Sequence, residues 1–298
     1  MQDMRIQTFL TVCATMNYTR ASEVLNITQP AVSQHIRYLE QEYDCRLFSY
    51  SGKKLRLTAA GRMLQQTATA MRNDEMLLKK QMLEKDAQDI PVHFGVTMTI
   101  GEYVIARPLA RYLKSHPHAD VRMTIGNTEK LIRELRSGEL HFALMEGYFD
   151  RNDFDSMTYA TVPFIPVCAA KHLFRNKPEK MSDLLSENLL IREHGSGTRD
   201  VLEKQLAAMG MTTEDFAGHT EIGGMHAILQ MLEEDAGISF LYRPAARAQL
   251  AGGTLMEIQL KDFDVRHDFA FIWEKGSTYT ETYRNICREL MENGKTAD

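Results

Sequence analysis

Apolar residues recur at steps of three and four along residues 3 to 16, which is the spacing of one face of a helix. A second short helix is expected next, with Thr19 as its cap and Asn26 at its end. A third helix begins after Thr28 and carries Pro30 in its first turn, where a missing N–H costs nothing. Its expected buried stripe is Val32, Ile36, Leu39 and Tyr43. The chain therefore opens with three short helices.

Two strand-like pieces between Leu47 and Leu57 flank a turn around residues 51–52, which predicts a hairpin, or wing. From residue 58 to about residue 89 a long helix is expected. Its apolar positions form a seam like that of a coiled coil: Leu64, Ala68, Met71, Leu78 and Met82. A lone helix cannot bury such a seam. We expect it to pair with another subunit, and packing on its own domain is the alternative.

Beyond Pro91 the pattern changes to strands alternating with helices. Strands are expected at residues 92–97, 121–127, 142–147, 162–169, 189–193, 238–242, 255–260 and 269–274. Helices are expected at residues 101–115, 128–137, 198–209, 225–234, 243–251 and 278–293. This alternation predicts an α/β fold with a largely parallel sheet, long enough for two lobes.

Composition limits the classes of protein that fit. With 298 residues, 44% hydrophobic and 25% charged, the chain is expected to be a water-soluble globular protein of more than one domain. Four scattered cysteines do not suggest a disulfide scaffold or a zinc site, which favours a reducing cytoplasm. No apolar run is long enough for a membrane helix, so no membrane partner is expected. Residues 1–90 hold 12 Lys and Arg against 10 Asp and Glu, and residues 91–298 hold 23 against 30. This charge difference alone barely favours a nucleic-acid site.

The segment from residue 18 to residue 61 carries small motifs in a fixed order. They are Ala21-Ser22, Leu25, Thr28-Gln-Pro-Ala-Val-Ser33, Leu39-Glu40, Leu47-Phe48 and Leu57-Thr-Ala-Ala-Gly61. Together they resemble the N-terminal winged helix-turn-helix of the LysR-type transcriptional regulators. The resemblance implies that the third helix enters the major groove of DNA and that the wing reaches the backbone or the minor groove.

Helical geometry agrees with that expectation. When the buried stripe of the third helix turns inward, its amides, a hydroxyl and a guanidinium turn outward, toward base edges and phosphates. The expected DNA contacts are Thr28, Gln29, Pro30, Ser33, Gln34 and Arg37 from the helix and Lys53 and Lys54 from the wing. A merely solvated face is the alternative. The chain departs from the family pattern at Asp44, where glycine is common, and at Tyr50, where arginine is common. Tyr50 removes one usual phosphate contact.

The resemblance extends to the end of the chain, through the family's two-lobed regulatory domain, which is similar to periplasmic solute-binding proteins. It implies a DNA-binding domain at residues 1–58, a linker and dimerisation helix at 59–90 and an effector-binding domain at 91–298. Lobe I is expected at 92–161 and 268–298, and lobe II at 162–267, with two crossover strands between them. Ligands of open α/β sheets lie beyond the carboxyl ends of strands, so the cleft between lobes is the expected effector site.

Polar residues follow several of those strand ends. The expected effector contacts are Thr97, Met98, Thr99, Asn127, Thr128, Ser196, Gly197, Thr198, Arg199 and, more weakly, His226. The glycine-rich turn before the helix at 198 exposes backbone N–H groups at a positive helix end, which suits a carboxylate or a phosphate. As alternatives, Ser196 and the threonines cap helices, Arg199 makes a surface ion pair, and His226 is packed or solvated.

No catalytic constellation is found. The residue two before Ser196 is His194, so the G-x-S-x-G motif of serine hydrolases fails. No P-loop and no HExxH occur, and His116 and His118 are read as solvated rather than as metal ligands. No cofactor or metal is therefore expected, and the chain is not expected to be an enzyme.

The sequence thus predicts a ligand-responsive, DNA-binding transcriptional regulator whose effector is a small anionic metabolite. The resemblance further implies RNA polymerase as a partner, a tetramer built from dimers and a pseudo-palindromic operator. The alternative is a cytoplasmic solute-binding or hydrolytic α/β protein whose N-terminal helices serve only dimerisation.

Overall fold

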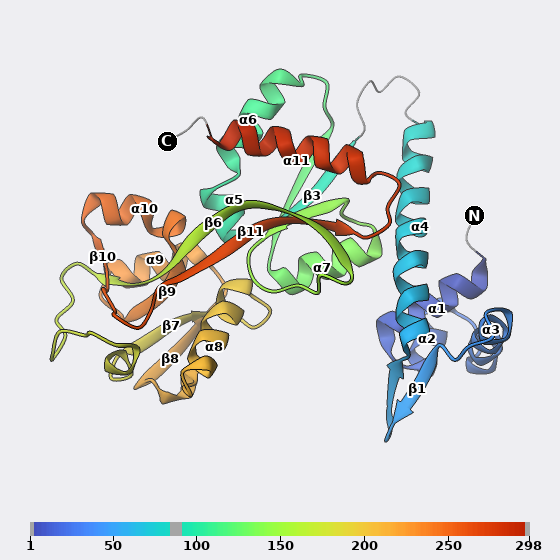
Figure 1. The fold of residues 1–298 in the computed structure, drawn as a ribbon, viewed down its shortest axis with the longest axis horizontal. Helices are drawn as coiled ribbons and strands as arrows, with labels where there is room; N and C mark the ends of the chain where they lie inside the picture. Colours follow the sequence, from blue (N-terminus) through green and yellow to red (C-terminus); the bar gives the residue numbers. More distant parts are fainter. Residues whose placement is uncertain (1–2, 84–90, 296–298) are drawn as a thin grey trace. The chain divides into compact units, whose positions relative to one another are not determined.

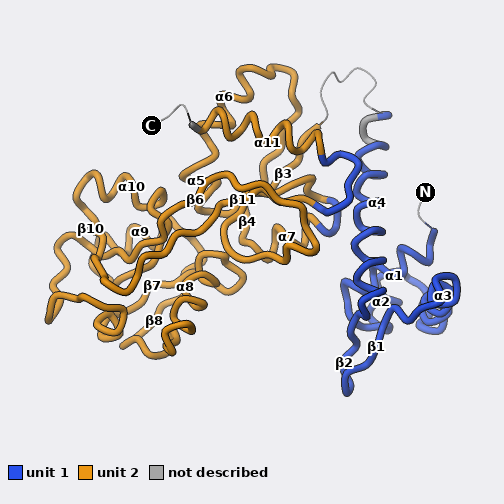
Figure 2. The backbone as a smooth tube through the Cα atoms, in the orientation of Figure 1, with its two compact units in different colours: residues 1–87, 136–138, 274–280 blue, residues 88–135, 139–273, 281–298 orange. Residues whose placement is uncertain are grey.

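A computed structural model describes residues 3–83 and 91–295 of the chain. The backbone divides into two compact units, which are considered separately below (Figure 2). The N-terminal unit comprises residues 1–87 with 136–138 and 274–280, and the regulatory unit comprises residues 88–135, 139–273 and 281–298. No helix in the described ranges is both long and apolar enough to cross a bilayer.

Three helices form the core of the N-terminal unit: α1 (Met4–Thr15), α2 (Tyr18–Leu25) and α3 (Gln29–Glu42) (Figure 1). Their inner faces bury one apolar cluster, which includes Phe9, Val12, Ala21, Val32, Ile36 and Leu39. The expected start of three short helices is confirmed. One expected member of the buried stripe is wrong, because Tyr43 is 50% exposed at the C-terminal end of α3.

Side chains set the ends of α2 and α3. Asn17, and not Thr19 as expected, caps α2, because its Oδ1 accepts hydrogen bonds from the N–H groups of Thr19 and Arg20. Asn26 ends α2 in the left-handed region, at φ 53°. Thr28 caps α3 as expected, since its Oγ1 accepts from the N–H of Ala31. Short polar side chains thus satisfy backbone groups that a helix end leaves without partners.

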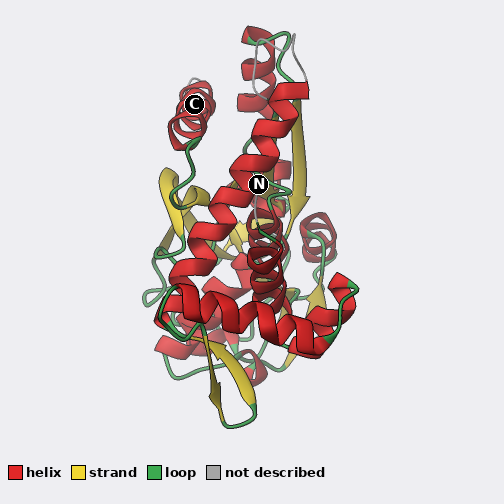
Figure 3. Ribbon diagram, turned by 90° about the vertical axis from the view of Figure 1, so that its right-hand side faces the viewer, coloured by secondary structure: helices red, strands yellow, loops and turns green. Residues whose placement is uncertain are grey.

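The predicted hairpin is present as β1 (Phe48–Ser51) and β2 (Lys54–Leu57) (Figure 3). The strands are antiparallel, with Phe48 opposite Leu57 and Ser51 opposite Lys54. Gly52 occupies the turn at φ +63°, a conformation that only glycine adopts without cost. Asp44 also lies in the left-handed region, at φ 46°, so the position where the family commonly has glycine does require that backbone shape here.

The long helix α4 runs over Ala59–Leu83. Residues 84–90, the rest of the helix expected to reach residue 89, lie outside the described residues. The apolar seam of α4 divides into two parts. Ala68 is buried in the core of the N-terminal unit and Leu64 packs against it, whereas Met71, Leu78 and Met82 are exposed. The first part therefore follows the alternative reading, packing on its own domain, and the second part offers an apolar face.

The regulatory unit is built on a nine-stranded mixed sheet with the order β4-β3-β5-β11-β6-β9-β7-β8, to which β10 adds by pairing with β6. Its strands are β3 (Val92–Thr97), β4 (Val121–Gly126), β5 (Phe142–Met145), β6 (Phe154–Ala169), β7 (Asn188–Arg192), β8 (Gly218–Ile222), β9 (Ile238–Tyr242), β10 (Leu255–Glu257) and β11 (Val265–Glu274). Its α-helices are α5 (Met98–Tyr103), α6 (Ala106–Ser115), α7 (Thr128–Ser137), α8 (Gly197–Ala208), α9 (Met225–Glu233), α10 (Arg243–Gly252) and α11 (Thr280–Lys295).

Two long strands, β6 and β11, lie in the middle of this sheet (Figure 1). We refer to β3–β5 with α5–α7 and α11 as lobe I, and to β7–β10 with α8–α10 as lobe II. Pairs within a lobe are parallel, such as β3 with β4 and β7 with β8. By contrast, β6 is antiparallel to β9 and β10, and β11 is antiparallel to β5. The expected largely parallel sheet is therefore correct within each lobe and wrong for these two strands.

The structure departs from the expected elements most clearly in three places. The helix expected at 101–115 is two helices, α5 and α6, because Pro108 has no N–H to donate to residue 104 and its ring obstructs a continuous helix. β6 begins at Phe154, eight residues before the apolar run that predicts it. The edge strand β8 has no expected counterpart, because its middle residues are polar and exposed.

Candidate functional site

The DNA-facing candidate of the N-terminal unit is a concavity of about 650 Å³ between α3 and the hairpin. It gathers Gln29, Ser33 and Arg37 from α3 and Lys53 from the hairpin turn, four of the residues that the sequence predicts. Thr28, Pro30, Gln34 and Lys54 are exposed beside it and do not line it. The concavity thus joins an amide, a hydroxyl and two cations on one surface.

Local contacts hold part of this polar face in place. The Nε2 of Gln29 donates to the Oγ of Ser33 at 3.0 Å, one helical turn away on the same face. Both side chains retain further donors and acceptors for base edges or phosphates. The arrangement therefore presents a partly ordered set of hydrogen-bonding groups.

Sequence reasoning missed several residues that line the same concavity, among them Asn17, Thr19 and Arg46. Arg46 pairs with Glu40 at 2.9 Å and keeps an exposed side chain. Tyr50, at the position where the family commonly has arginine, also lines the concavity. Its side chain is 69% exposed. The signal for Arg46 was its place just before the hairpin, whereas nothing in the spacing marks the start of α2 as part of this surface.

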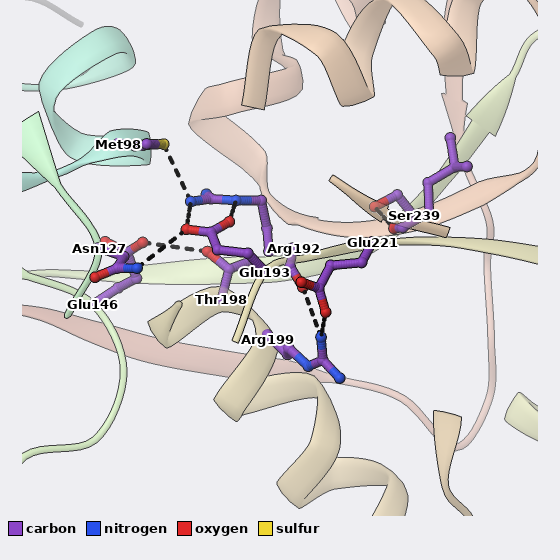
Figure 4. A network of polar contacts seen from close by, with 10 residues as sticks. Met98, Asn127, Glu146, Arg192, Glu193, Thr198, Arg199, Glu221 and Ser239 are labelled. Carbon is purple, nitrogen blue, oxygen red and sulfur yellow. Dashed lines mark hydrogen bonds and ion pairs between the residues drawn. The ribbon is translucent and has the colours of Figure 1, made fainter. Parts of the chain in front are cut away.

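In the regulatory unit, the end of β3 and the residue after β5 meet the start of α8. Thr97, at the N-terminus of α5, donates to one carboxyl oxygen of Glu146. Thr198, in the first turn of α8, donates to the other at 3.2 Å (Figure 4). Thr128 donates to the backbone carbonyl of Glu146 at 3.3 Å. Glu146 thus links lobe I to lobe II, and sequence reasoning missed it.

Backbone contacts bring the two lobes together at the same point. The N–H of Glu129 donates to the carbonyl of Gly195 at 3.2 Å. A Cβ on Gly147 would lie 2.6 Å from the Cα of Gly197, and a Cβ on Gly197 would clash with the carbonyl oxygen of Glu146. The glycines of the 195–197 turn therefore allow an approach that any side chain would prevent.

A second polar group lies beside the first (Figure 4). The guanidinium of Arg192 binds both carboxyl oxygens of Glu193, at 2.8 and 2.9 Å, and its Nη2 also lies 3.2 Å from the sulfur of Met98. Asn127 donates to Glu193 at 3.5 Å and accepts from the N–H of Lys130, so it also caps the start of α7. The predicted residues Met98 and Asn127 therefore reach lobe II through Arg192 and Glu193, which were not predicted to contribute.

Two predicted residues take other positions. Arg199 is buried and is held by Glu203 and Glu221, both at 2.6 Å, and by the carbonyl of Arg192. Its guanidinium therefore orients the start of α8. Arg199 makes ion pairs, as the alternative to a ligand contact predicts, but its side chain is buried whereas the two glutamates are partly exposed. His226 is exposed near the start of α9.

Unpartnered hydroxyls mark the same region. Ser196 precedes α8 but makes no side-chain capping bond, and its Oγ is buried without a partner in the described part of the chain. The Oγ1 of Thr99, in the first turn of α5, is also buried without a partner there. Buried polar atoms are nearly always hydrogen-bonded, so these two hydroxyls are exceptions in the described part of the chain.

Burial dominates the electrostatics of Glu146, whose carboxyl group is 1% exposed. Loss of solvation raises its pKa above the ordinary value, against the opposing effects of the Thr97 and Thr198 hydroxyls and of Arg192. The one sequence signal for this residue was its place directly after four buried apolar residues of β5 and before a glycine. The predicted strand at 142–147 had placed it inside the sheet.

Within the described ranges, no cluster of three or more His, Cys, Asp and Glu side chains is arranged to hold a metal ion. His116, one of the two histidines considered for a metal, stacks on Tyr112 and lies 3.4 Å from Glu289.

Comparison with known proteins assigns both units. Residues 4–62 match the family model described as "Bacterial regulatory helix-turn-helix protein, lysR family", and residues 88–295 match that of the "LysR substrate binding domain". The transcriptional regulator CysL of Bacillus subtilis is 28% identical over 272 residues, which cover 90% of this chain and 89% of CysL. Full-length LysG of Corynebacterium glutamicum, solved with bound effector Arg, matches with a TM-score of 0.62 at 14% identity, over 98% of this chain and 99% of LysG.

A third match covers the regulatory unit. The CcmR regulatory domain of Synechocystis, solved in complex with 2-PG, has a TM-score of 0.60 at 20% identity, over 70% of this chain and 98% of that domain. Because the two family models together span both units, the chain belongs to the LysR family of transcriptional regulators, with a DNA-binding helix-turn-helix followed by an effector-binding domain.

Proposed function

We propose that α3 and the hairpin read a specific DNA site, and that a small molecule bound between the two lobes of the regulatory unit controls this binding. The observation that carries the DNA-reading part is the shared concavity of Gln29, Ser33, Arg37 and Lys53. Amides and guanidinium groups match base edges in the major groove, and lysine suits phosphates.

Self-association follows from α4. Met71, Leu78 and Met82 are exposed on this helix, and a second copy of α4 would bury them. A symmetric dimer presents two α3 helices and therefore favours a pseudo-palindromic operator. We further propose a tetramer of two dimers, contact with RNA polymerase at the promoter and a location in the cytoplasm, where the DNA lies.

The interlobe effector site comprises Thr97, Thr99 and Thr128 from lobe I with Ser196, Gly197 and Thr198 from lobe II. Hydroxyls from both lobes meet there, and the N-terminus of the 12-residue helix α8 favours an anionic group such as a carboxylate or a phosphate. Met98 and Asn127 border the site through Arg192 and Glu193. A ligand there regulates DNA binding only if it binds two lobe arrangements with different affinity.

The DNA-reading part is tested by selecting bound duplexes from a random pool with the full-length protein. We expect enrichment of an inverted repeat, and an affinity that falls by orders of magnitude between about 50 and 200 mM salt. Arg37→Ala should lose discrimination between the selected site and random DNA by about tenfold to a hundredfold, the value of a bidentate base contact. Ser33→Ala removes a single hydroxyl and should lose less discrimination.

Arg175→Ala and Ser182→Ala, at exposed positions of the regulatory unit, are the matched controls. If the α3 variants keep wild-type specificity, α3 is not the recognition helix. If no site is enriched and no salt dependence is seen, the alternative of a solute-binding or hydrolytic protein is favoured.

The effector part is tested by thermal unfolding of the full-length protein with a panel of carboxylates, phosphate esters, amino acids and aromatic acids. A ligand at about a hundred times its Kd stabilises the protein by about 2.7 kcal/mol. The single tryptophan, Trp273, is buried in β11 and reports on the regulatory unit. Ser196→Ala should weaken the shift, and a shift that survives both Ser196→Ala and Thr99→Ala places the ligand elsewhere.

A further inference from the structure

Glu146 places a carboxyl group in the interlobe site, where the sequence predicts only donors for an anionic effector. It follows the last residue of β5, is fully enclosed, and bonds with hydroxyls of both lobes through Thr97 and Thr198. The bond from Thr198 to Glu146 is drawn in Figure 4. A ligand between the lobes therefore meets a carboxyl group that comes from the protein itself.

The nearby positive charge does not neutralise Glu146. The guanidinium of Arg192 is engaged by both oxygens of Glu193, and Arg199 is engaged by Glu203 and Glu221. Glu146 makes no ion pair among the described residues, and burial raises its pKa. A buried carboxylate without a counter-ion is costly and needs either a proton or a cationic partner.

Two hydroxyls without partners in the described ranges are near neighbours, along the chain, of the two threonines that bond to Glu146. The buried Oγ1 of Thr99 lies in the helical turn that follows Thr97, and the buried Oγ of Ser196 precedes the turn that holds Thr198. A protonated amine has three N–H donors, which suit one carboxylate oxygen and two hydroxyl oxygens. The N–H groups of the first turn of a helix have no partner within the helix, so those of α8 suit a carboxylate next to that amine.

Space between the lobes is small. Gly147 and Gly197 touch through their backbones, and Thr198 hydrogen-bonds directly to Glu146. A positive group and a negative group of the ligand must therefore lie close together, as they do in an α-amino acid.

We propose that the interlobe site selects a small zwitterion, an α-amino acid, whose ammonium group binds Glu146 with the hydroxyls of Thr99 and Ser196 and whose carboxylate binds the N-terminus of α8. This inference rests on the proposed effector site and names the chemical class of its ligand. It changes the expectation of a purely anionic effector: the ligand keeps a carboxylate and also carries an ammonium group.

The test measures binding of the twenty standard L-amino acids to the full-length protein by calorimetry, each against its 2-hydroxy acid where that compound exists. The hydroxy acid keeps the carboxylate and side chain and lacks the ammonium group. We expect at least one amino acid to bind, its hydroxy acid to bind about tenfold more weakly or worse, and Glu146→Gln to remove that preference. Glu234→Gln, at an exposed position on lobe II, is the matched control and should bind as the wild type does.

Other outcomes separate this inference from the proposed function. If carboxylates without an amine bind equally well, and lose affinity in Ser196→Ala, the effector site stands and the zwitterion is wrong. If an amino acid binds but neither Glu146→Gln nor Ser196→Ala weakens it, both proposals fail, because the ligand binds elsewhere. If no amino acid binds, the zwitterion is wrong. Glu146→Asp, which keeps the charge and is shorter, should retain part of the preference for the amine even if Glu146→Gln unfolds.

Discussion

The two candidate sites of this chain are assembled in different ways. The candidate DNA-binding concavity is built from residues 16–55, a continuous stretch that holds four local elements, α2, α3, β1 and β2. The interlobe site draws on residues 97–99, 127–128, 146 and 192–198, which come from five strands and helices of the regulatory unit. The residues of the local site could be predicted from the sequence, because they lie close together along the chain. The distributed site includes residues such as Glu146, which only folding brings to it.

Glycine serves the two regions differently. In the N-terminal unit, a Cβ on Gly61 would clash with the carbonyl oxygen of Leu47 and lie 2.8 Å from Leu57. This glycine therefore lets the start of α4 pack closely against the hairpin region of the same unit. In the regulatory unit, a Cβ on Gly197 would clash with Glu146 and lie 2.8 Å from Thr128, so that glycine lets two lobes meet. The first contact lies within one packed core, and the second joins residues of two lobes.

The largest expected effect comes from adding one methyl group at each of these positions. Gly61→Ala should destabilise the N-terminal unit by about 1–3 kcal/mol, as overpacking does, because the carbonyl group of Leu47 cannot move freely. Gly197→Ala should instead separate the lobes, raising hydrogen exchange at residues 142–147 and 197–201. Exchange measured by mass spectrometry on the full-length protein distinguishes the two effects.

Gly252→Ala is the control for both glycine variants, since nothing lies within 4 Å of a Cβ at that position. It should leave exchange unchanged outside α10. Equal changes in all three variants would contradict the contrast between the core contact and the interlobe contact.

The next effect concerns the pH dependence of the regulatory unit. Burial raises the pKa of Glu146 above its ordinary value of 4.5, so the folded chain holds a proton that the unfolded chain has already released. The free energy of unfolding should therefore fall as pH rises from 4.5 toward the raised pKa, by at most about 1.4 kcal/mol per pH unit for one proton. Glu146→Gln should remove this decline, measured by urea unfolding with Trp273 fluorescence.

The variant should thus gain stability relative to the wild type as pH rises across that window. Glu234→Gln, at an exposed position, should follow the wild-type pH profile. A difference between Glu146→Gln and the wild type that does not change with pH would show that Glu146 does not titrate in the folded chain.

A smaller effect is expected at Asp44, which holds a left-handed conformation at φ 46°. Asp44→Gly should stabilise the N-terminal unit by up to about 1 kcal/mol, because glycine adopts this conformation without the contact between Cβ and the backbone. Asp44→Ala keeps that contact and should give no gain. Circular dichroism and hydrogen exchange at residues 18–48 would measure the stability of both variants. Equal stability of the two variants would show that the left-handed conformation at position 44 carries no such cost.

The smallest effect concerns the wing. Tyr50→Arg adds a guanidinium to the concavity and should increase DNA affinity several-fold, with a salt slope steeper by about 0.9 for one more neutralised phosphate. Tyr43→Arg adds the same charge at an exposed position that does not line the concavity. Titrations with DNA at several salt concentrations measure both slopes. If both variants change the salt slope equally, position 50 does not lie closer to the phosphates than position 43.

Much of the fold could be predicted from particular residues. The step-three and step-four apolar positions of α1 and α3, the Thr28 cap and the hairpin at Gly52 were confirmed, since each depends on neighbours within a few residues. Where several nearby groups compete, local reasoning chose wrongly, as when Asn17 capped α2 in place of Thr19. The start of β6 and the strand β8 were missed because their residues are partly exposed and owe their conformation to neighbouring strands.

The sequence by itself determined the family, the α/β class and the polar face of α3, because motif order, periodicity and capping are properties of short segments. Only the tertiary structure decided the antiparallel pairs of the two long central strands. It also decided the ion pairs of Arg199 with Glu203 and Glu221 and the contact of Glu146 with the start of α8. The physical reason is distance along the chain. Hydrogen bonds and desolvation act between atoms that folding brings together, here residues 146 and 198, and no periodicity in the sequence records that contact.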